Sequence, residues 1–445
     1  MPNKIIFNND YPIIQKSEEL YSRAFGLIPS VTQTLAKGPS QYVDGVAPKY
    51  LVKGKGSHVW DADENQYLDY NMGIGPLVLG YSYPSVDAAI LDQLKDGITF
   101  SLMHPLEVEV AELIREIIPN AESIRYSKTG ADVTSAAIRL ARAFTGKDKI
   151  LCCGYHGWHD WYISVTSRNS GIPSAVRDLT YTFNYNDLGS LQKSIDNDTA
   201  AVILEPVVFE EPKNNFLHDL ADLCKRKNVL LIFDEMWTGF RMEIGGAQEY
   251  FGIIPDLATY SKAVANGMPL AVLTGKKEIM RLAENEVFFY TTFGGEALSL
   301  AAAKATIKEI INNRVPMQLN DKGKILKDGY NNIVNELSIN CTKCIGYNFR
   351  SLVTFNHPTI DSLLLKSFVQ QEMIKRGILW SGYHNISLSH SHDDISYTLT
   401  AYKEVLQLLK DAVEKNEVGK RLRGKPVEPV FRKTDSFNTK PVVKV

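Results

Sequence analysis

Three short and almost continuous apolar runs constrain the fold of this chain more than any other feature. They are KILCCG (149–154), AAVILEP (200–206) and VLLIFDE (229–235). Strands that are buried on both faces have this composition, and such strands are usually parallel. Between the last two runs, residues 215–228 place leucines at helical spacing, and 269–275 is a further apolar run. The order strand, helix, strand predicts an α/β fold built on a parallel sheet.

The pattern changes on either side of this region. Segment 58–70 predicts a β-hairpin, because two aromatic and apolar runs flank a polar turn. Segments 351–356 and 385–415 predict one or two strands followed by a long helix, and hence a second, smaller α/β unit. The tail 419–445 is basic and contains prolines, so we expect an extended arm.

Charge and composition narrow the class of protein. The chain has 445 residues and a formal net charge of −2, so no overall field attracts nucleic acid or an anionic membrane. No apolar run approaches the roughly 18–20 residues that a membrane span needs, and the first residues lack a signal-peptide pattern. Five cysteines in a chain of this length do not make a disulfide framework. We therefore expect a cytoplasmic protein that binds neither nucleic acid nor membrane.

Polar side chains follow the apolar runs at the point where each predicted strand ends. Tyr155 and His156 come after the first run, Glu205 after the second and Asp234 after the third. Ligands of open parallel sheets bind beyond the carboxyl ends of the strands, so we expect these side chains to meet at one edge. An acid in such a position can also cap a helix, and for each acid alone that alternative stays open.

Lys262 is the only charged residue between Leu257 and Thr274. Burial disfavours an ammonium group and lowers its pKa. This cost is tolerable where a neutral amine is needed as a nucleophile, for instance toward an aldehyde. The segment therefore predicts a buried, nucleophilic lysine, and a lysine on a surface loop is the alternative.

Thr129 and Gly130 stand at the start of a predicted helix whose apolar side runs through 131–141. Free backbone N–H groups and the positive end of the helix dipole at such a point suit a phosphate, and an ordinary helix cap is the alternative. A phosphate cradle, a carboxylate and a nucleophilic lysine are together what pyridoxal phosphate requires. The lysine takes its aldehyde, and the acid keeps its ring nitrogen protonated.

The chain resembles the class III (fold type I) aminotransferases, and within them the glutamate-1-semialdehyde aminomutase branch. The resemblance covers about residues 17–414, and the motifs that carry it are GIGPLVLGYSYP (73–84), IRLARAFTGKDKI (138–150), GYHG (154–157), DEMWTGFR (234–241) and GGAQEYFGIIPDL (245–257). It implies a large, doubly wound, mostly parallel sheet domain and a smaller α/β domain built from both chain ends.

On this basis we expect four regions. Residues 1–70 form an N-terminal arm and part of the small domain, and residues 71–315 form the large domain that binds pyridoxal 5′-phosphate. Residues 316–418 complete the small domain, and 419–445 is the basic tail.

The resemblance also implies roles for single residues. Lys262 matches the lysine that forms the Schiff base, and Asp234 matches the partner of the pyridinium nitrogen. Tyr155 matches the ring that stacks on the cofactor, and Thr292 in TTFGG (291–295) matches a phosphate-binding threonine lent by the neighbouring subunit, so the family implies a homodimer with shared active sites. The remaining expected cofactor-binding residues are Thr129, Gly130, Ala131, His156 and Glu205.

The chain departs from the family at positions that bear on substrate. Thr129-Gly130-Ala131 stands where Ser-Gly-Thr is usual, and Lys128 precedes it. AVANGMP (263–269) replaces a glycine-rich gate, and Glu296 begins a Glu-Ala pair where Asn-Pro is usual. Lys37 stands nearest to the arginine that holds the substrate carboxylate in the aminomutase. The candidate substrate residues are Lys37, Trp158, Trp237 and Glu296.

We expect an aminotransferase that moves an amino group from an amino acid, glutamate being the expected donor, to an aldehyde or ketone by a ping-pong Schiff-base mechanism. A sugar-like acceptor is one hypothesis. The first alternative is a glutamate-1-semialdehyde 2,1-aminomutase, which is an isomerase. A metalloenzyme, based on the histidines and acids in 155–160 and 390–394, and a non-catalytic binding protein are remote alternatives. We expect no metal site.

Overall fold

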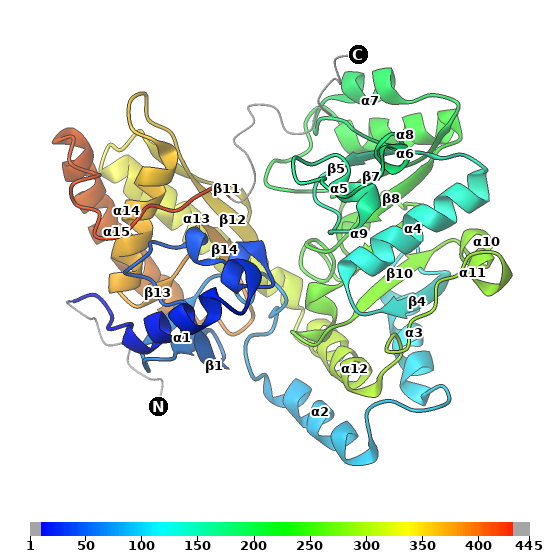
Figure 1. Cartoon of the computed structure of the whole chain (residues 1–445), viewed down its shortest axis with the longest axis horizontal. Helices are drawn as coiled ribbons and strands as arrows, with labels where there is room; N and C mark the ends of the chain where they lie inside the picture. Colours follow the sequence, from blue (N-terminus) through cyan, green and yellow to red (C-terminus); the bar gives the residue numbers. More distant parts are fainter. Residues whose placement is uncertain (1–9, 430–445) are drawn as a thin grey trace. The chain divides into compact units, whose positions relative to one another are not determined.

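The computed structural model describes residues 10–429, which divide into two compact units (Figure 1). The central unit is Pro84–Pro316. The terminal unit combines residues 10–83 with residues 317–429 of the described chain. The parts of the expected N-terminal arm and tail at 1–9 and 430–445 lie outside the described residues.

A mixed sheet forms the core of the central unit. Among the described residues its strand order is β4-β10-β9-β8-β7-β5-β6. The strands are β4 (Ser123–Ser127), β5 (Lys149–Cys153), β6 (Thr180–Thr182), β7 (Thr199–Leu204), β8 (Leu230–Asp234), β9 (Leu257–Tyr260) and β10 (Ala271–Gly275). The three apolar runs form β5, β7 and β8, and every residue of β7 is buried, as expected for a strand covered on both faces. The predicted α/β class is confirmed.

Strand direction decides where a site can form. The pairs β5–β6, β5–β7, β7–β8 and β8–β9 are parallel. β10 runs antiparallel to both β9 and β4, so β4 points the same way as the parallel strands. The carboxyl ends of β4, β5, β7, β8 and β9 therefore share one edge. β6 and β7 flank β5 on opposite sides, which makes the β5/β7 boundary a topological switch point, where α/β proteins bind ligands.

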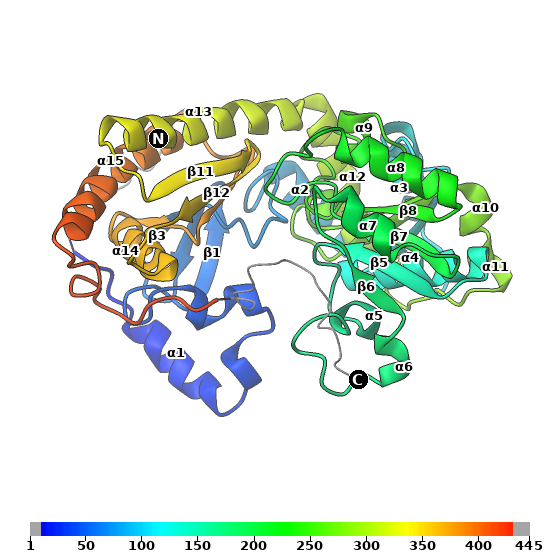
Figure 2. The same ribbon diagram turned by 90° about the horizontal axis from the view of Figure 1, so that it is seen from above.

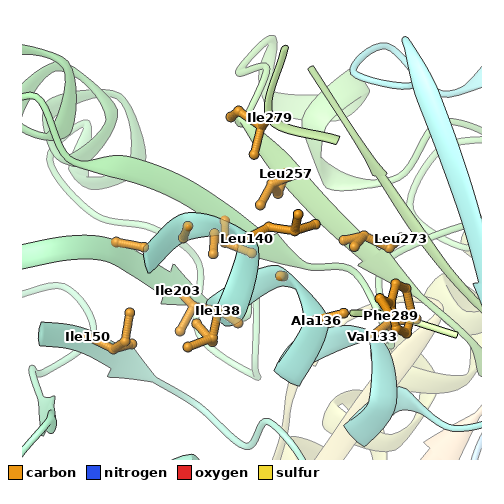
Figure 3. Close-up of a cluster of buried hydrophobic side chains, with 14 of the residues drawn as sticks. Val133, Ala136, Ile138, Leu140, Ile150, Ile203, Leu257, Leu273, Ile279 and Phe289 are labelled. Atoms are coloured by element: carbon orange, nitrogen blue, oxygen red, sulfur yellow. The ribbon is translucent and has the colours of Figure 1, made fainter. Parts of the chain in front are cut away.

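Helices cover both faces of this sheet (Figure 2). The helices of the central unit are α2 (Pro84–Asp96), α3 (Pro105–Ile117), α4 (Gly130–Thr145), α5 (Asp160–Ile163), α6 (Ser174–Arg177), α7 (Leu188–Ser194), α8 (Phe216–Lys227), α9 (Ala247–Phe251), α10 (Lys277–Met280), α11 (Leu282–Asn285) and α12 (Ala297–Asn312). α4 packs its Val133 and Leu140 against Ile203 and Leu273 of the strands (Figure 3). Burial of each such side chain contributes about 1.5–3 kcal/mol, so the position of α4 on the sheet is well fixed.

The terminal unit contains two small sheets, of order β1-β2-β3-β13 and β11-β12-β14 in the described residues. Its strands are β1 (Leu51–Lys55), β2 (His58–Asp61), β3 (Gln66–Asp69), β11 (Thr342–Tyr347), β12 (Arg350–Phe355), β13 (Ile378–Leu379) and β14 (Tyr383–Asn385). Its helices are α1 (Gln15–Phe25), α14 (Ser362–Lys375) and α15 (His392–Glu414), with short 3₁₀ turns η1 (Pro29–Val31), η2 (Leu35–Lys37) and η3 (Pro39–Gln41). α13 (Val315–Glu336) begins at the boundary between the units.

The terminal unit joins sequence from both sides of the central unit. The predicted hairpin at 58–70 forms as β2 and β3, which pair antiparallel. β3 in turn pairs in parallel with β13, with Leu68 opposite Ile378. None of the helices within 10–429 combines the length and the apolarity that a membrane crossing needs.

Candidate active site

The predicted site residues of the central unit gather at the shared carboxyl edge of its sheet. Thr129 follows β4, Tyr155 and His156 follow β5, and Glu205 follows β7. Asp234 is the last residue of β8. Lys262 follows β9, with Ser261 between them.

The turn between β4 and α4 offers backbone N–H groups. Thr129 caps α4: its Oγ1 accepts a hydrogen bond from Asp132 N at 3.3 Å, and the Asp132 carboxylate accepts one from Thr129 N at 2.8 Å. In the part of the chain that the structure describes, no acceptor meets the N–H groups of Gly130 or Ala131. First-turn N–H groups of a helix attract anions, so this turn, 128–131, can hold a phosphate.

Two glycine contacts pack neighbouring loops onto that turn. A Cβ at Gly130 would lie 3.0 Å from Met236 Sδ, and a Cβ at Gly157 would lie 2.8 Å from Ala131 Cβ. Thr134 Oγ1 also donates to the His156 carbonyl oxygen at 2.8 Å. The loops after β5 and β8 are therefore in contact with the start of α4.

Asp234 and His156 form a fully buried pair. His156 Nδ1 lies 2.8 Å from Asp234 Oδ2, and its Nε2 lies 3.2 Å from the Cys153 carbonyl oxygen. Carbonyl and carboxylate oxygens both accept hydrogen bonds, so the ring lies between two acceptors, one from β5 and one from β8. The second carboxylate oxygen of Asp234 accepts from Met236 N at 3.1 Å.

Tyr155 and Glu205 lie together at the β5/β7 switch point. Tyr155 N donates to Glu205 Oε1 at 3.1 Å. A Cβ at Gly154, whose φ is +112°, would lie 3.0 Å from Glu205 Cγ, so the glycine permits this approach. The Tyr155 side chain is 49% exposed. Burial of its remainder, together with the charges of Asp234 and Glu205, raises the pKa of Tyr155.

Lys262 begins the 3₁₀ turn η4 (Lys262–Ala265) with a φ of +46°. Its Nζ lies 4.2 Å from the centre of the Trp237 ring, and Arg241 lies near the same ring at 5.9 Å. The prediction of a buried lysine is wrong in degree, because the Lys262 side chain is half-buried whereas Ala263–Ala265 are buried. A positive φ is costly for a residue with a Cβ and is typical of functional positions.

The remaining predicted residues have the following positions in the chain. Trp158 is 69% exposed, and Thr292 is exposed in the loop that precedes α12. Lys37 ends η2 of the terminal unit. Glu296 caps α12 and forms an ion pair with Lys128.

Two residues of this edge were not predicted from the sequence. Asp132 orders the turn before α4, and the spacing Thr-x-x-Asp, which is typical of a capping box, could have identified it. Met236 packs on Gly130, and no local pattern distinguishes it from an ordinary core methionine.

The histidines of the metal alternative have other neighbours. His156 contacts Asp234, whereas His159 Nδ1 lies 2.7 Å from Ser135 Oγ. Within residues 10–429 no group of His, Cys, Asp and Glu is arranged to hold a metal ion.

The fold and this sheet edge together define an α/β transferase of the type that uses pyridoxal phosphate, fold type I. Residues 42–346 match the family described as Aminotransferase class-III, and the chain belongs to that family. It is therefore an enzyme, and its cofactor is pyridoxal 5′-phosphate.

Similar proteins include both aminotransferases and aminomutases. The 3-aminobutyryl-CoA aminotransferase of Cloacimonas acidaminovorans is 34% identical, over 89% of this chain and 98% of its own. The glutamate-1-semialdehyde 2,1-aminomutase of Archaeoglobus fulgidus is 33% identical, over 88% of this chain and all of its own (100%). The solved structure of the FumI protein of Sphingopyxis sp. MTA144, in its PLP internal aldimine form, has a TM-score of 0.84 and 27% identity, covering 93% of this chain and 99% of that one.

Proposed function

We propose that this enzyme is an aminotransferase in which Lys262 and Asp234 act on pyridoxal 5′-phosphate. The observation that carries the proposal is the meeting of three features at one sheet edge: an open helix N-terminus, a buried acid with a histidine partner, and a lysine amine. Neither a helix cap nor a surface lysine alone requires the other two.

The residues present fit the cofactor. The glycine at 130 allows Met236 to pack closely on the turn, and the N–H groups of Gly130 and Ala131 suit a phosphate. The carboxylate of Asp234 suits a protonated ring nitrogen, since a buried carboxylate needs cationic or hydrogen-bonding partners. When bound, the cofactor withdraws electrons from the α-carbon of an attached amine and so allows that carbon to lose a proton.

Each residue then has a defined task. Thr129, Gly130 and Ala131 bind the phosphate, and Asp234 holds a proton on the ring nitrogen, with His156 keeping the Asp234 carboxylate oriented. Tyr155 covers the ring, and Glu205 holds the Tyr155 backbone in place. Lys262 is the catalytic base, whose Nζ moves a proton away from the substrate α-carbon.

Chemical labelling tests the role of Lys262. Borohydride reduction of the cofactor-loaded enzyme, followed by peptide mapping, is expected to leave a covalent adduct on Lys262. An adduct on any other lysine contradicts the proposal. Lys262→Ala is expected to abolish turnover while it still binds the cofactor noncovalently, so loss of binding and loss of chemistry can be measured separately.

We infer transamination between two substrates rather than isomerisation of one. The expected donor is glutamate, and the acceptor is an aldehyde or ketone, with a sugar-like compound as one hypothesis. Support comes from a relative named as an aminotransferase and from Lys37, which stands where the aminomutase branch has an arginine. A lysine is a point charge and does not replace the two-pronged grip of arginine on a carboxylate.

The aminomutase remains the second candidate, because relatives at 33% identity carry that name. Incubation with glutamate-1-semialdehyde alone, without an added amino donor, separates the two functions. An aminotransferase is expected to give no sustained formation of 5-aminolevulinate, because it releases the product of each half-reaction instead of holding the intermediate for the second one. Sustained formation of 5-aminolevulinate over many turnovers would instead establish the aminomutase.

The active enzyme is proposed to be a homodimer in which Thr292 reaches the phosphate bound by the partner subunit. Thr292 is exposed, and so are the neighbouring Phe288, Tyr290 and Phe293. Exposed aromatic residues close together mark interaction surfaces. Sedimentation of the loaded enzyme at working concentration is expected to give a dimer, and a fully active monomer would contradict the shared site.

A further inference from the structure

Lys128 and Glu296 form a partly buried ion pair beside the proposed phosphate turn. Lys128 Nζ lies 2.7 Å from Glu296 Oε1, and the two side chains are 18% and 10% exposed. Lys128 is the residue between the end of β4 and Thr129. Both residues were singled out as departures from the family pattern, and the structure shows that the two departures contact each other.

The Glu296 carboxylate holds two elements at once. Its Oε2 accepts from Leu298 N at 2.8 Å and its Oε1 accepts from Ser299 N at 3.1 Å, which caps α12. The ammonium of Lys128 occupies the remaining acceptor capacity of Oε1. One carboxylate therefore connects the N-terminus of α12 to the residue that precedes the cap of α4.

The turn is then fixed from both sides. Asp132 accepts hydrogen bonds from Ser127 Oγ and from Thr129 N, both at 2.8 Å. Glu296 holds Lys128, which lies between those two residues. The loop before Glu296 also packs on β4, since a Cβ at Gly294 would lie 3.0 Å from the Tyr126 carbonyl oxygen.

Burial and the contact between Lys128 and Glu296 together set the pKa values of the two side chains. Burial lowers the pKa of Lys128, although Glu296 acts in the opposite direction. Burial alone would raise the pKa of Glu296, but hydrogen bonds from Lys128 and Ser299 outweigh it, so its pKa lies below the ordinary value. Lys128 is therefore held by the Glu296 carboxylate, whose pKa the contact lowers.

We propose that Lys128 and Glu296 are a positioning pair for the phosphate of the cofactor. The pair holds the backbone of the 128–131 turn so that the N–H groups of Gly130 and Ala131 stay aligned. In this proposal Glu296 is a positioning residue and no longer a substrate-binding candidate. This inference rests on the proposed function only in that it takes the turn to bind the cofactor phosphate.

The test compares pyridoxal phosphate with pyridoxal, which lacks the phosphate. Lys128→Met, Glu296→Gln and the double variant are prepared as full-length chains, and the affinity for each compound is measured by titration. Glutamine keeps an acceptor for the cap of α12, so α12 is expected to stay folded. Each single variant is expected to bind pyridoxal phosphate on the order of tenfold more weakly, as the loss of a coupled contact predicts, with unchanged affinity for pyridoxal.

The double variant and a control pair complete the test. The double variant is expected to be no weaker than either single variant, because both remove the same contact. Lys403→Met and Glu336→Gln break an exposed Lys–Glu pair (62% and 59% exposed) in the terminal unit and are expected to change neither affinity.

Four results would overturn the inference. They are unchanged affinity for pyridoxal phosphate in both single variants, an equal loss for pyridoxal, additive losses in the double variant, or a loss in Lys128→Met without one in Glu296→Gln, which would make Lys128 a direct phosphate ligand. Failure of the proposed function is distinguishable, because the unaltered enzyme would then fail to bind pyridoxal phosphate or to give the adduct on Lys262.

Discussion

The hydrogen bonds of the His156 ring decide how Asp234 can act. Both ring nitrogens face acceptors, Asp234 Oδ2 at 2.8 Å and the Cys153 carbonyl oxygen at 3.2 Å. The ring therefore bridges the Asp234 carboxylate to the backbone of β5, which keeps the acid in one orientation.

Two substitutions measure this arrangement. Asp234→Asn is expected to lower kcat by about two to three orders of magnitude, the usual cost of removing one placed electrostatic group, while the cofactor stays bound. His156→Gln keeps a donor but removes the rigid ring that contacts both Asp234 and the Cys153 carbonyl oxygen. It is expected to lower kcat on the order of tenfold, because the carboxylate is then held less firmly in one orientation.

His159→Gln is the matched control. His159 lies in the same loop, and its Nδ1 contacts Ser135 Oγ instead of an acid, so near-normal kcat is expected. Equal losses in His156→Gln and His159→Gln would show that the loop as a whole matters, and near-normal activity of Asp234→Asn would refute the role of the acid.

At the scale of single residues, the sequence predicts where a side chain lies better than it predicts which side chain it contacts. Tyr155, His156, Glu205 and Asp234 could be placed at one edge because each follows an apolar strand. The bond between His156 and Asp234 joins residues 78 positions apart, and no local pattern encodes it. The exposure of Lys262 was also beyond the sequence, because uncharged neighbours indicate a buried segment but not how far a long side chain reaches toward solvent.

Among the elements, the contact between the loop after β5 and the start of α4 depends on one glycine. Gly157 has a φ of +104°, and a Cβ there would lie 2.8 Å from Ala131 Cβ and 2.9 Å from Ala131 Cα. Gly157→Ala is therefore expected to push the phosphate turn away. We expect a loss of about 1–3 kcal/mol in the free energy of unfolding and weaker retention of pyridoxal phosphate.

Gly171→Ala is the control that separates backbone strain from steric overlap. Gly171 also has a positive φ, +88°, but a Cβ there meets nothing within 4 Å. It is expected to lower stability without affecting cofactor retention. If thermal unfolding and cofactor retention respond alike in the two variants, the contact with Ala131 has no special effect.

Two buried histidines give the terminal unit a pH dependence. Burial, with the charge of His390 as a second cause, lowers the pKa of His384 to about 3. Burial also lowers the pKa of His390, to about 4, against the opposing charge of Asp394. Below about pH 6.5 the unfolded rings bind protons that the folded rings do not. The free energy of unfolding is thus expected to fall as the pH drops from about 6.5 to about 4, by at most about 1.4 kcal/mol per pH unit for each ring.

His384→Gln tests that dependence, because it removes one titrating ring while it can still bond to Ser351 and Tyr402, the partners of His384. Denaturant unfolding across this pH range is expected to show a shallower slope for the variant. Burial raises the pKa of Glu235 to about 7, so this residue makes the free energy of unfolding rise as the pH falls. Glu235 is present in both proteins and therefore does not affect the difference between their slopes. Identical slopes would contradict the assignment.

The elements that the sequence predicted are those with a strong hydrophobic pattern. β5, β7 and β8 are apolar except for one polar residue at an end of each strand, so they could be predicted directly. β4 (Ser123–Ser127) could not, because only its last residue is buried and its sequence, SIRYS, is mostly polar. The antiparallel direction of β10 was also not predictable, since an apolar run does not encode the direction in which its strand is paired.

At the scale of the whole molecule, the pairing of chain ends was implied by family resemblance and not by pattern. β3 and β13 pair through Leu68 and Ile378, far apart in the sequence, and β13 is too short to be recognised. The arrangement keeps Pro84–Pro316 as one uninterrupted unit, so every residue proposed for the cofactor, apart from one supplied by a partner subunit, comes from a continuous stretch of chain.

The proposed exchange of Thr292 between subunits can be tested with hybrid dimers. Thr292→Ala alone is expected to weaken retention of pyridoxal phosphate, because a hydroxyl that donates to a phosphate makes a charge-assisted hydrogen bond. Lys262→Ala alone is expected to be inactive. The two variants are then unfolded together, refolded and supplied with a limiting amount of pyridoxal phosphate. Each variant refolded alone serves as the control.

In a hybrid dimer the two defects fall in the same site if Thr292 acts on the partner. The site that keeps Lys262 then receives an intact Thr292 from the Lys262→Ala chain, so cofactor retention and turnover at that site are expected to equal those of the unaltered enzyme. The other site carries both defects and stays inactive. If Thr292 served its own chain, the site with Lys262 would keep the Thr292→Ala defect, and mixing would restore nothing. The activity per retained cofactor in the mixture, compared with that of the two controls, therefore decides whether the active site is completed across a subunit interface.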